Sequence, residues 1–365
     1  MTLPIKHEPY SDKYFLRAKE ILKGESCHFL VTVQVFVRNG NARIYGLKEA
    51  QEIIQKYGEH VSLRIWSLKD GDHFDPSEPV MVIRGSIQRL IDLETMYLGV
   101  ISARTTLEND KQDINLKQIE ENMGKIVDLV GDKPVSYFGA RHWSWDRDAD
   151  ISRACLNAGA ANCSTDIGAA TVNEKGIGTI PHSLEAIYHK KFGLDSAVVE
   201  STLAFDAAMP KDVPRIALID YANHEIQDSI KTAEVLEDYG NKKLDGIRID
   251  TCGENIIQSG MHMDDSSFWF GKGVCISGVY NIRKALDYSG FDYVKIILSS
   301  GFGNPDKVKA FVDAEKILKT KLFDGLGVGG VFHSRMATAD IVKIGDVPIS
   351  KAGRKCGNFE RLKRI

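Results

Sequence analysis

From about residue 134 on, polar residues or glycines stand at the end of each short apolar run of this sequence. The runs are "PVSYFGA", "AANCST", "GIGTIP", "RIALID", "GIRID", "VKIILSS" and "LFDGLGVG". The residues at or near their ends are Arg141, Asp166, His182, Asp220, Arg248, Asp250, Ser299, Ser300, Gly301, Gly327, Gly329 and Gly330. If the runs are parallel strands of one barrel, their carboxyl ends meet at one face, where such folds do their chemistry. We therefore expect these residues to form one site.

His182, directly after Pro181, has several possible roles from its residue type alone. A histidine beside a carboxylate can act as an acid, a base or a nucleophile. It can also be a half-buried, hydrogen-bonded residue with no chemical role. A zinc ligand is disfavoured, because no second His or Cys lies at ligand spacing and none of the six cysteines forms a C-x-x-C pair.

Two glycine-rich loops and two carboxylates indicate an anionic substrate. "SSGFGNPDKVKAF", which includes Gly303, leads into a helical pattern, and its backbone N–H groups could hold a phosphate. "GLGVGG" could do the same, although tight turns also explain such glycines. Asp220 and Asp250 could hold a hydrated Mg²⁺, or could only cap helices and accept hydrogen bonds. These residues predict a phosphorylated substrate with magnesium but leave the reaction open.

The order of elements predicts an α/β fold with two domains. Residues 1–130 mix helical and strand patterns, which is typical of an α+β domain. Residues 131–334 alternate short apolar runs with helical segments, which predicts an irregular TIM-like barrel of about seven strands. Residues 335–365 contain a hairpin pattern, with "IGDVP" as its turn, that we expect to complete the sandwich-like first domain.

Composition narrows the class of partner. The formal net charge of −3 argues against a nucleic-acid binder, which usually carries a basic surplus. No apolar run approaches the length of a membrane span, and "MTLPIKHEPYSDKY" lacks the pattern of a signal peptide. We expect a cytoplasmic protein that acts on small molecules.

An ordered set of motifs resembles the nicotinate phosphoribosyltransferase family. The motifs are "SDKYFLRAKEIL", "FDPSEPVMVIRG", "DLETMYLG", "FGARHWSWDRDADISRACLNAGAANCSTD", "GTIPHS", "ALIDYAN", "DGIRIDT", "VKIILSSGFG" and "ATADIVKIGDVPISKAGR". They run through nearly the whole chain, and their order carries the resemblance. This type II phosphoribosyltransferase family has nicotinamide and quinolinate enzymes as relatives.

The resemblance implies a reaction and its co-substrates. Phosphoribose would pass from phosphoribosyl pyrophosphate to the ring nitrogen of nicotinate, giving nicotinate mononucleotide for NAD synthesis and releasing pyrophosphate. ATP would phosphorylate His182, and the phosphohistidine would favour the forward reaction. Mg²⁺ would assist, and Asp220 and Asp250 would lie near the ribose, the magnesium and the histidine.

The resemblance also implies roles for further residues. Phe138 would cover one face of the pyridine ring, and Tyr14 of a neighbouring subunit the other, which implies a homodimer with shared sites. The implied substrate contacts also include Arg141, Asp166, Thr179 and Arg248. The loops at Ser299–Gly303 and Gly327–Gly330 would hold phosphate.

Two departures from the family pattern leave the pyridine open. His142 stands where many nicotinate enzymes have a second basic residue, and Asp166 where they often have Ser and nicotinamide enzymes have Asp. An acid there would repel a carboxylate and accept a hydrogen bond from an amide. We expect nicotinate first, then nicotinamide, then quinolinate. The rivals of another class are a catalytically silent nucleotide-binding barrel and a lysine-dependent lyase, and no strand-like run ends in the lysine that the lyase needs.

Overall fold

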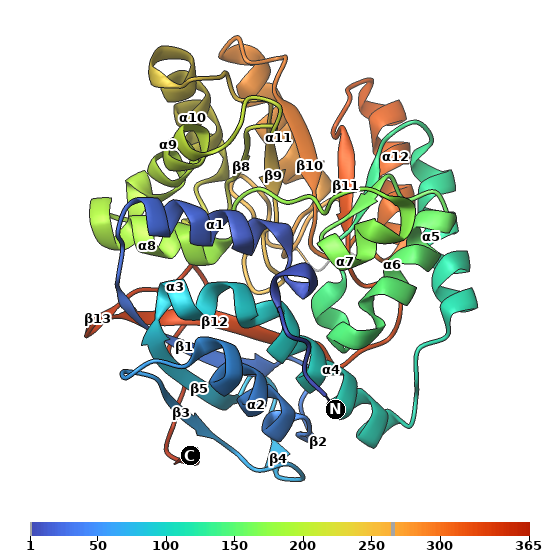
Figure 1. The fold of residues 1–365 in the computed structure, drawn as a ribbon. Coiled ribbons are helices and arrows are strands. Elements are labelled where there is room, and N and C mark those ends of the chain that lie inside the picture. Colours follow the sequence, from blue (N-terminus) through green and yellow to red (C-terminus); the bar gives the residue numbers. More distant parts are fainter. Residues whose placement is uncertain (1, 264–266) are drawn as a thin grey trace.

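Two β-sheets organise the chain in the computed structural model, which describes residues 2–263 and 267–365. In Figure 1 the antiparallel sheet lies below and the parallel sheet above, with helices packed against both. The space between the sheets contains the candidate site described below.

The first sheet combines residues from both ends of the chain. Its strand order is β13-β12-β1-β5-β3-β14. The strands are β1 (Leu30–Val37), β3 (Arg64–Ser67), β5 (Pro79–Ser86), β12 (Ala337–Ile344), β13 (Val347–Pro348) and β14 (Lys363–Arg364). The sequence of β1, "LVTVQVFV", suits a central strand, because β-branched and aromatic side chains pack well on a sheet covered on both faces. In the registers of β1 with β5 and β12, Val33 lies opposite Ile83 and Ile341.

Helices cover this sheet and connect it to the rest of the chain. They are α1 (Lys13–Gly24), α2 (Leu47–Gly58), α3 (Ile87–Leu90) and α4 (Glu94–Asp110), and β2 (Ala42–Arg43) pairs with β4 (His73–Phe74) beside them. Helix α5 (Leu116–Val130) instead packs against helices of the parallel-sheet half. Helix α4 is buried almost all round, because it packs against α2, β12 and the turn at Ala140–His142. It therefore lies between the two halves of the molecule.

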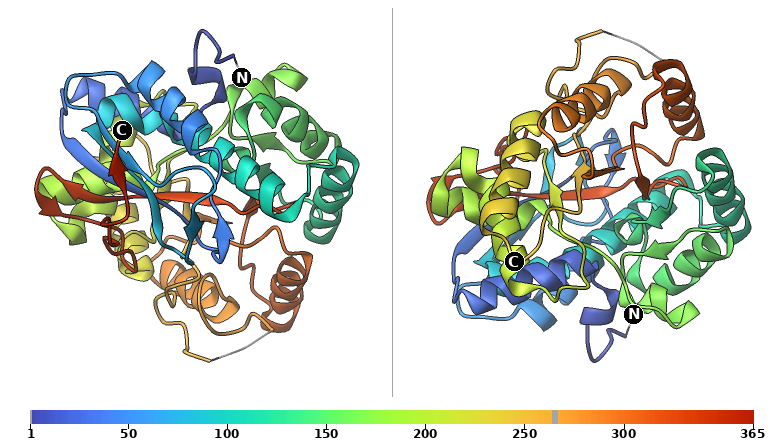
Figure 2. Two further views of the ribbon diagram at one scale, coloured as in Figure 1. Left: turned by 90° about the horizontal axis from the view of Figure 1, so that it is seen from below. Right: turned by 90° about the horizontal axis from the view of Figure 1, so that it is seen from above.

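The second sheet is parallel throughout. Its strand order is β7-β6-β11-β10-β9-β8. The strands are β6 (Val135–Tyr137), β7 (Asn162–Cys163), β8 (Ile216–Leu218), β9 (Gly246–Ile249), β10 (Lys295–Leu298) and β11 (Gly325–Val328). The associated helices are α6 (Asp148–Asn157), α7 (Asp166–Ala169), α8 (His182–Phe192), α9 (Ala197–Ala208), α10 (Glu225–Tyr239), α11 (Ile276–Tyr288) and α12 (Pro305–Leu318). The right-hand view of Figure 2 shows helices around the strands, as in a barrel.

The predicted α/β class, with a barrel-like parallel sheet and a separate sheet unit, is confirmed, but the expected number of strands is wrong. The described residues contain six strands in this sheet, and no pairing between β7 and β8 closes it. The run "GIGTIP", expected to be a strand, is extended but forms no ladder. One bond, from Ile177 N to Cys163 O, ties it to β7. Helix α1 takes other contacts of this segment, since Arg17 donates to Gly178 O and Gly178 lies against Tyr14.

Candidate active site

A cavity of about 570 Å³ lies where the parallel strands end and is also lined by residues of β12 and α4. The predicted residues that line it are Tyr14, Phe138, Arg141, His182, Arg248, Asp250, Ser299, Ser300, Gly301, Gly303, Gly327, Gly329 and Gly330. They come from separate strand ends and from α1, so the fold brings together residues that lie far apart in the sequence.

His182 is the first residue of α8, directly after Pro181, and contacts two charged groups. Its Nε2 lies 3.0 Å from Asp220 Oδ1 and 3.0 Å from Lys351 Nζ. Lys351 also donates to Asp220 Oδ2, so both carboxylate oxygens have partners. Asp220 is fully buried, and the side chain of Lys351 is only 7% exposed. The three side chains form one cluster, in which Asp220 and Lys351 are buried and the side chain of His182 is 29% exposed.

The electrostatics of this cluster favour a neutral histidine. Burial and the ammonium of Lys351 lower the pKa of His182, and Asp220 only partly opposes them. Burial alone would raise the pKa of Asp220, but Lys351 and His182 outweigh it and lower that pKa. Burial opposes the charge on Lys351, but Asp220 outweighs this and raises the pKa of the ammonium. An imidazole without a proton on one nitrogen, beside a carboxylate, can act as a nucleophile or a base.

Two aromatic rings and two guanidinium groups line the middle of the cavity. The guanidinium carbons of Arg141 and Arg248 each lie 5.9 Å from the centre of the Tyr14 ring. Phe138 lies over Gly327, where an added β-carbon would come within 2.5 Å of the ring. Position 327 therefore has no room for a side chain while Phe138 keeps this place.

The two arginines differ in how much of their charge is already paired. Arg141 Nη1 donates to Glu94 Oε1 at 2.8 Å, and its Nε lies 3.5 Å from Asp12 Oδ2. Arg248 Nη2 donates to the carbonyl of Ile180 at 3.0 Å. Burial raises the pKa of Glu94 to about 7, although Arg141 opposes the shift. Arg248 thus offers the less compensated positive charge.

The two glycine-rich loops meet at one side of the cavity. A β-carbon on Gly303 would come within 2.2 Å of Gly330 O, so the two backbones are in close contact. Ser300 and Gly301 both have left-handed backbone conformations, with φ of 68° and 86°. Lys307 of α12 donates to Ser300 O at 3.0 Å, and burial lowers its pKa to about 8. Backbone amides of such loops, with a cation behind them, suit a phosphate group.

The two predicted magnesium ligands differ in their surroundings. Asp220 has both oxygens engaged by His182 and Lys351, which does not suit a metal ligand. Asp250 lines the cavity and accepts one bond, from Ser299 Oγ at 2.8 Å, which leaves its other oxygen for a cation. In the described part of the chain no cluster of three or more His, Cys, Asp or Glu side chains is arranged for a metal. Asp250 therefore fits a hydrated Mg²⁺ that substrate oxygens also bind, and Asp220 does not.

Three predicted residues lie outside the cavity lining. Asp220 is behind His182, as described above. Asp166 Oδ2 pairs with Lys13 Nζ at 2.7 Å, and its Oδ1 accepts from Gly176 N at 3.0 Å. Thr179 is in the extended segment before α8 and is not a lining residue. The structure thus directs the Asp166 carboxylate at α1 and the backbone of residue 176, and not at the cavity.

The position of Tyr14 also differs from what the resemblance implied. Tyr14 lines the cavity of its own chain, because α1 packs against the extended segment at Gly178. The ring is therefore present in the site without a neighbouring subunit.

Several cavity residues had no predicted role. They are Arg38, Glu94, His142, Cys252, Asp340, Lys351 and Arg354. Arg38 and Arg354 both bind Glu254 at 2.8 Å; burial opposes the charge on this carboxylate, but these bonds outweigh it and lower its pKa to about 2. The basic run "SKAGRK" was the available signal for Lys351 and Arg354, but its pattern predicts only part of a hairpin.

The chain is similar to known proteins in sequence and in structure. Residues 12–104 match the family model for the quinolinate phosphoribosyl transferase N-terminal domain. The structure is similar to nicotinate phosphoribosyltransferase from Porphyromonas gingivalis (15% identity, 97% of each chain covered, TM-score 0.67). It is also similar to a putative nicotinate phosphoribosyltransferase from Saccharomyces cerevisiae (14% identity, 99% of this chain and 97% of that chain, TM-score 0.69).

A third solved structure is more similar in sequence. Nicotinate-nucleotide pyrophosphorylase from Pyrococcus furiosus is 27% identical, with 98% of this chain and 82% of that chain covered and a TM-score of 0.47.

None of the helices in residues 2–263 and 267–365 has the length and apolarity of a membrane span.

Proposed function

We propose that the chain is a type II phosphoribosyltransferase that transfers phosphoribose to a pyridine, with nicotinate as the preferred acceptor. The match of residues 12–104 to the quinolinate phosphoribosyl transferase N-terminal domain and the similarity to solved nicotinate phosphoribosyltransferases support this proposal. The products are nicotinate mononucleotide and pyrophosphate, which serve NAD synthesis. The observation that carries the proposal is the meeting of Tyr14, Phe138 and the two glycine-rich loops in one cavity. This arrangement suits a flat ring next to a phosphate-bearing sugar.

In the proposed reaction the bond from ribose C1′ to pyrophosphate oxygen breaks, and a bond from C1′ to the pyridine nitrogen forms. The ring nitrogen attacks with its own lone pair, so no strong base is needed. Positive charge develops on the ribose and negative charge on the leaving pyrophosphate. Loop amides and cationic side chains stabilise the leaving group. Alignment of the ring between Tyr14 and Phe138 supplies much of the rate enhancement.

Magnesium is part of the proposal through Asp250. The free oxygen of Asp250 would help to hold a hydrated ion, and Mg²⁺ bound there would supply positive charge to the pyrophosphate oxygens. Asp220 instead stabilises the charge that develops on His182.

We further propose that ATP phosphorylates His182. An unprotonated imidazole nitrogen attacks the terminal phosphorus, the N–P bond forms, and ADP leaves with the electrons of the broken P–O bond. The lowered pKa of His182 keeps the imidazole neutral and nucleophilic at neutral pH, and Asp220 balances the charge that the ring gains. Support for this role is the placement of His182 in the cavity between a carboxylate and an ammonium.

Nicotinamide is the second candidate acceptor. Arg248 favours a carboxylate, because in the described part of the chain its guanidinium is bound by the backbone carbonyl of Ile180 and by no carboxylate. Glu94 already pairs with Arg141. It favours nicotinamide, because a carboxylate accepts a hydrogen bond from an amide N–H and repels another carboxylate. Quinolinate is third, since the additional carboxylate needs further unpaired cations. Cytoplasmic location and a homodimer remain proposals.

The test is to incubate the enzyme with phosphoribosyl pyrophosphate and Mg²⁺ and with nicotinate, nicotinamide or quinolinate, each with and without ATP. We expect nicotinate mononucleotide to form fastest and ATP to increase its yield. Turnover of none of the three pyridines would favour the silent nucleotide-binding barrel over an enzyme. Faster turnover of nicotinamide would reverse the order of the first two candidates.

A further inference from the structure

His142 lines the cavity beside the second glycine-rich loop. A β-carbon placed on Gly329 would lie 2.9 Å from His142 Nε2, and one placed on Gly330 would lie 3.9 Å from its Cε1. On the other side of the ring, His142 Nδ1 lies 3.3 Å from Ser334 Oγ. The imidazole thus connects a serine to the loop where the two glycine-rich backbones meet.

The surroundings of His142 keep its ring neutral. Burial, with the guanidinium of Arg141 nearby, lowers the pKa of His142 to about 4. A neutral imidazole has one N–H, and the partner of one nitrogen decides which nitrogen carries it. If the Ser334 hydroxyl donates to Nδ1, the proton is on Nε2, which faces the loop.

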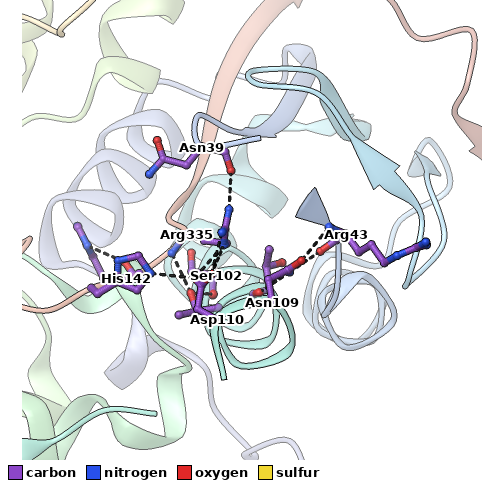
Figure 3. Close-up of polar contacts among 11 residues, drawn as sticks. Asn39, Arg43, Ser102, Asn109, Asp110, His142 and Arg335 are labelled. Carbon is purple, nitrogen blue, oxygen red and sulfur yellow. Dashed lines mark hydrogen bonds and ion pairs between the residues drawn. The ribbon is translucent and has the colours of Figure 1, made fainter. Parts of the chain in front are cut away.

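Helix α4 holds the segment around Ser334 in place through three polar residues, each one helical turn from the next. Ser102 Oγ accepts from Ala337 N at 2.9 Å, and its one hydroxyl proton is shared between Leu98 O at 2.8 Å and Arg141 O at 3.0 Å. Thr106 Oγ1 accepts from Arg335 N at 2.8 Å. The spacing of Ser102, Thr106 and Asp110 places all three on one face of the helix. They bind the segment that contains Ser334, as well as the backbone next to His142 (Figure 3).

Asp110, the third of these residues, forms an ion pair. Asp110 accepts from Arg335 Nη2 at 2.7 Å and from Arg335 Nε at 2.8 Å (Figure 3). His333 Nε2 lies 2.8 Å from the same carboxylate. Arg335 also donates to Asn39 O at 3.2 Å, which ties the segment to the end of β1. Residues on both sides of Ser334 are therefore anchored, which fixes the serine against His142.

From this arrangement we propose that His142 is a binding residue that donates an uncharged Nε2–H to a phosphate oxygen held at the loops of residues 300–303 and 327–330. Ser334 acts as a positioning residue that selects the tautomer. The inference rests on the proposed phosphoribosyl transfer and adds the group that binds the phosphate at this place. An uncharged donor orients a phosphate without adding to the positive charge that Arg248 and Lys307 already supply.

Calorimetric binding of phosphoribosyl pyrophosphate and of ribose 5-phosphate to the full-length protein tests this proposal without turnover. We expect His142→Leu to weaken both about tenfold or more, because a hydrogen bond to a charged group is lost. His142→Gln keeps a neutral donor near the position of Nε2 and should stay within about threefold of the wild type. The affinity for nicotinate serves as the ligand control and should not change in either variant.

The outcomes separate the two proposals. If the wild type binds neither phosphorylated ligand, the proposed function fails. If the wild type binds and His142→Leu binds equally well, or if the Gln and Leu variants lose affinity equally, only the role of His142 is overturned. If His142→Leu does not fold, nitrogen NMR of the wild type with labelled histidine tests the role of His142 instead. Ribose 5-phosphate should shift the protonated Nε2 resonance of His142, and an unchanged resonance would contradict the proposal.

Discussion

Lys351 Nζ lies 3.0 Å from His182 Nε2, although 169 residues separate the two in the sequence. The ammonium also binds Asp220, so one cation controls both the histidine and the carboxylate that would balance its charge. This contact exists because β12 pairs with β1, which brings the C-terminal segment over the ends of the parallel strands.

Replacing Lys351 should change the titration of His182. Lys351→Met removes an ammonium that lowers the pKa of His182, so that pKa should rise, as measured by histidine NMR. It should also destabilise the protein by about 3 kcal/mol in chemical unfolding, because a buried ion pair loses one partner. Lys351→Arg keeps the charge and is the matched control. A pKa of His182 that is equal in the Met variant and the wild type would contradict the electrostatic role.

His182→Ala should separate transfer from ATP use. We expect the variant to lose all stimulation by ATP while slow, ATP-independent transfer continues, because the pyridine nitrogen needs no base. Initial rates with and without ATP provide the measurement. Stimulation by ATP that is equal in variant and wild type would rule out His182 as the phosphate carrier.

Gly327→Ala should displace Phe138. The new β-carbon would come within 2.5 Å of the ring, so the ring must move away from the bound pyridine. We expect KM for the pyridine to rise about tenfold or more, since small misplacements at a reacting centre are costly. Gly124→Ala, in α5 with nothing within 4 Å of the added carbon, is the control and should stabilise the protein by about 1 kcal/mol. An unchanged KM in the Gly327 variant would mean that the ring does not contact the pyridine.

Asp166→Ser tests whether this acid selects the substrate. The structure directs its carboxylate at Lys13 and Gly176, so the ratio of kcat/KM for nicotinate and nicotinamide should stay within about threefold of the wild type. The partly exposed pair with Lys13 should contribute less than about 1 kcal/mol to stability. A clear shift towards nicotinate would instead restore Asp166 as a substrate contact.

His142 should give the protein a characteristic acid sensitivity. Its pKa is about 4 in the folded protein and near 6.5 when unperturbed, so the unfolded state binds more protons between these values. Stability should therefore fall as the pH drops from about 6.5 to about 4, by up to about 3 kcal/mol. His142→Gln has no titrating ring and should lose this part of the pH dependence. If the stability of the variant and of the wild type fell equally across this pH range, the result would contradict a neutral His142 ring in the folded protein.

The pattern of apolar runs predicted the α/β class because short buried strands and amphipathic helices have local signatures. It failed at "GIGTIP", which has the composition of a strand but contacts α1 instead of a neighbouring strand. The position of His182 at the start of α8 could be predicted because Pro181 marks a helix boundary. The direction of the Asp166 side chain could not be predicted, because a residue after a strand can turn towards the cavity or towards a packed helix.

The sequence alone determined which polar residues and glycines follow the strands, and parallel pairing then brings most of them to one face. Tertiary structure decided which of these side chains enter the cavity and which charges are already paired. Arg141 is bound by Glu94 and Asp12, and Lys351 reaches His182 from the C-terminal segment. The physical reason is that the presence of a strand or helix follows from local hydrophobic pattern, whereas contacts between distant segments depend on how whole sheets and helices pack.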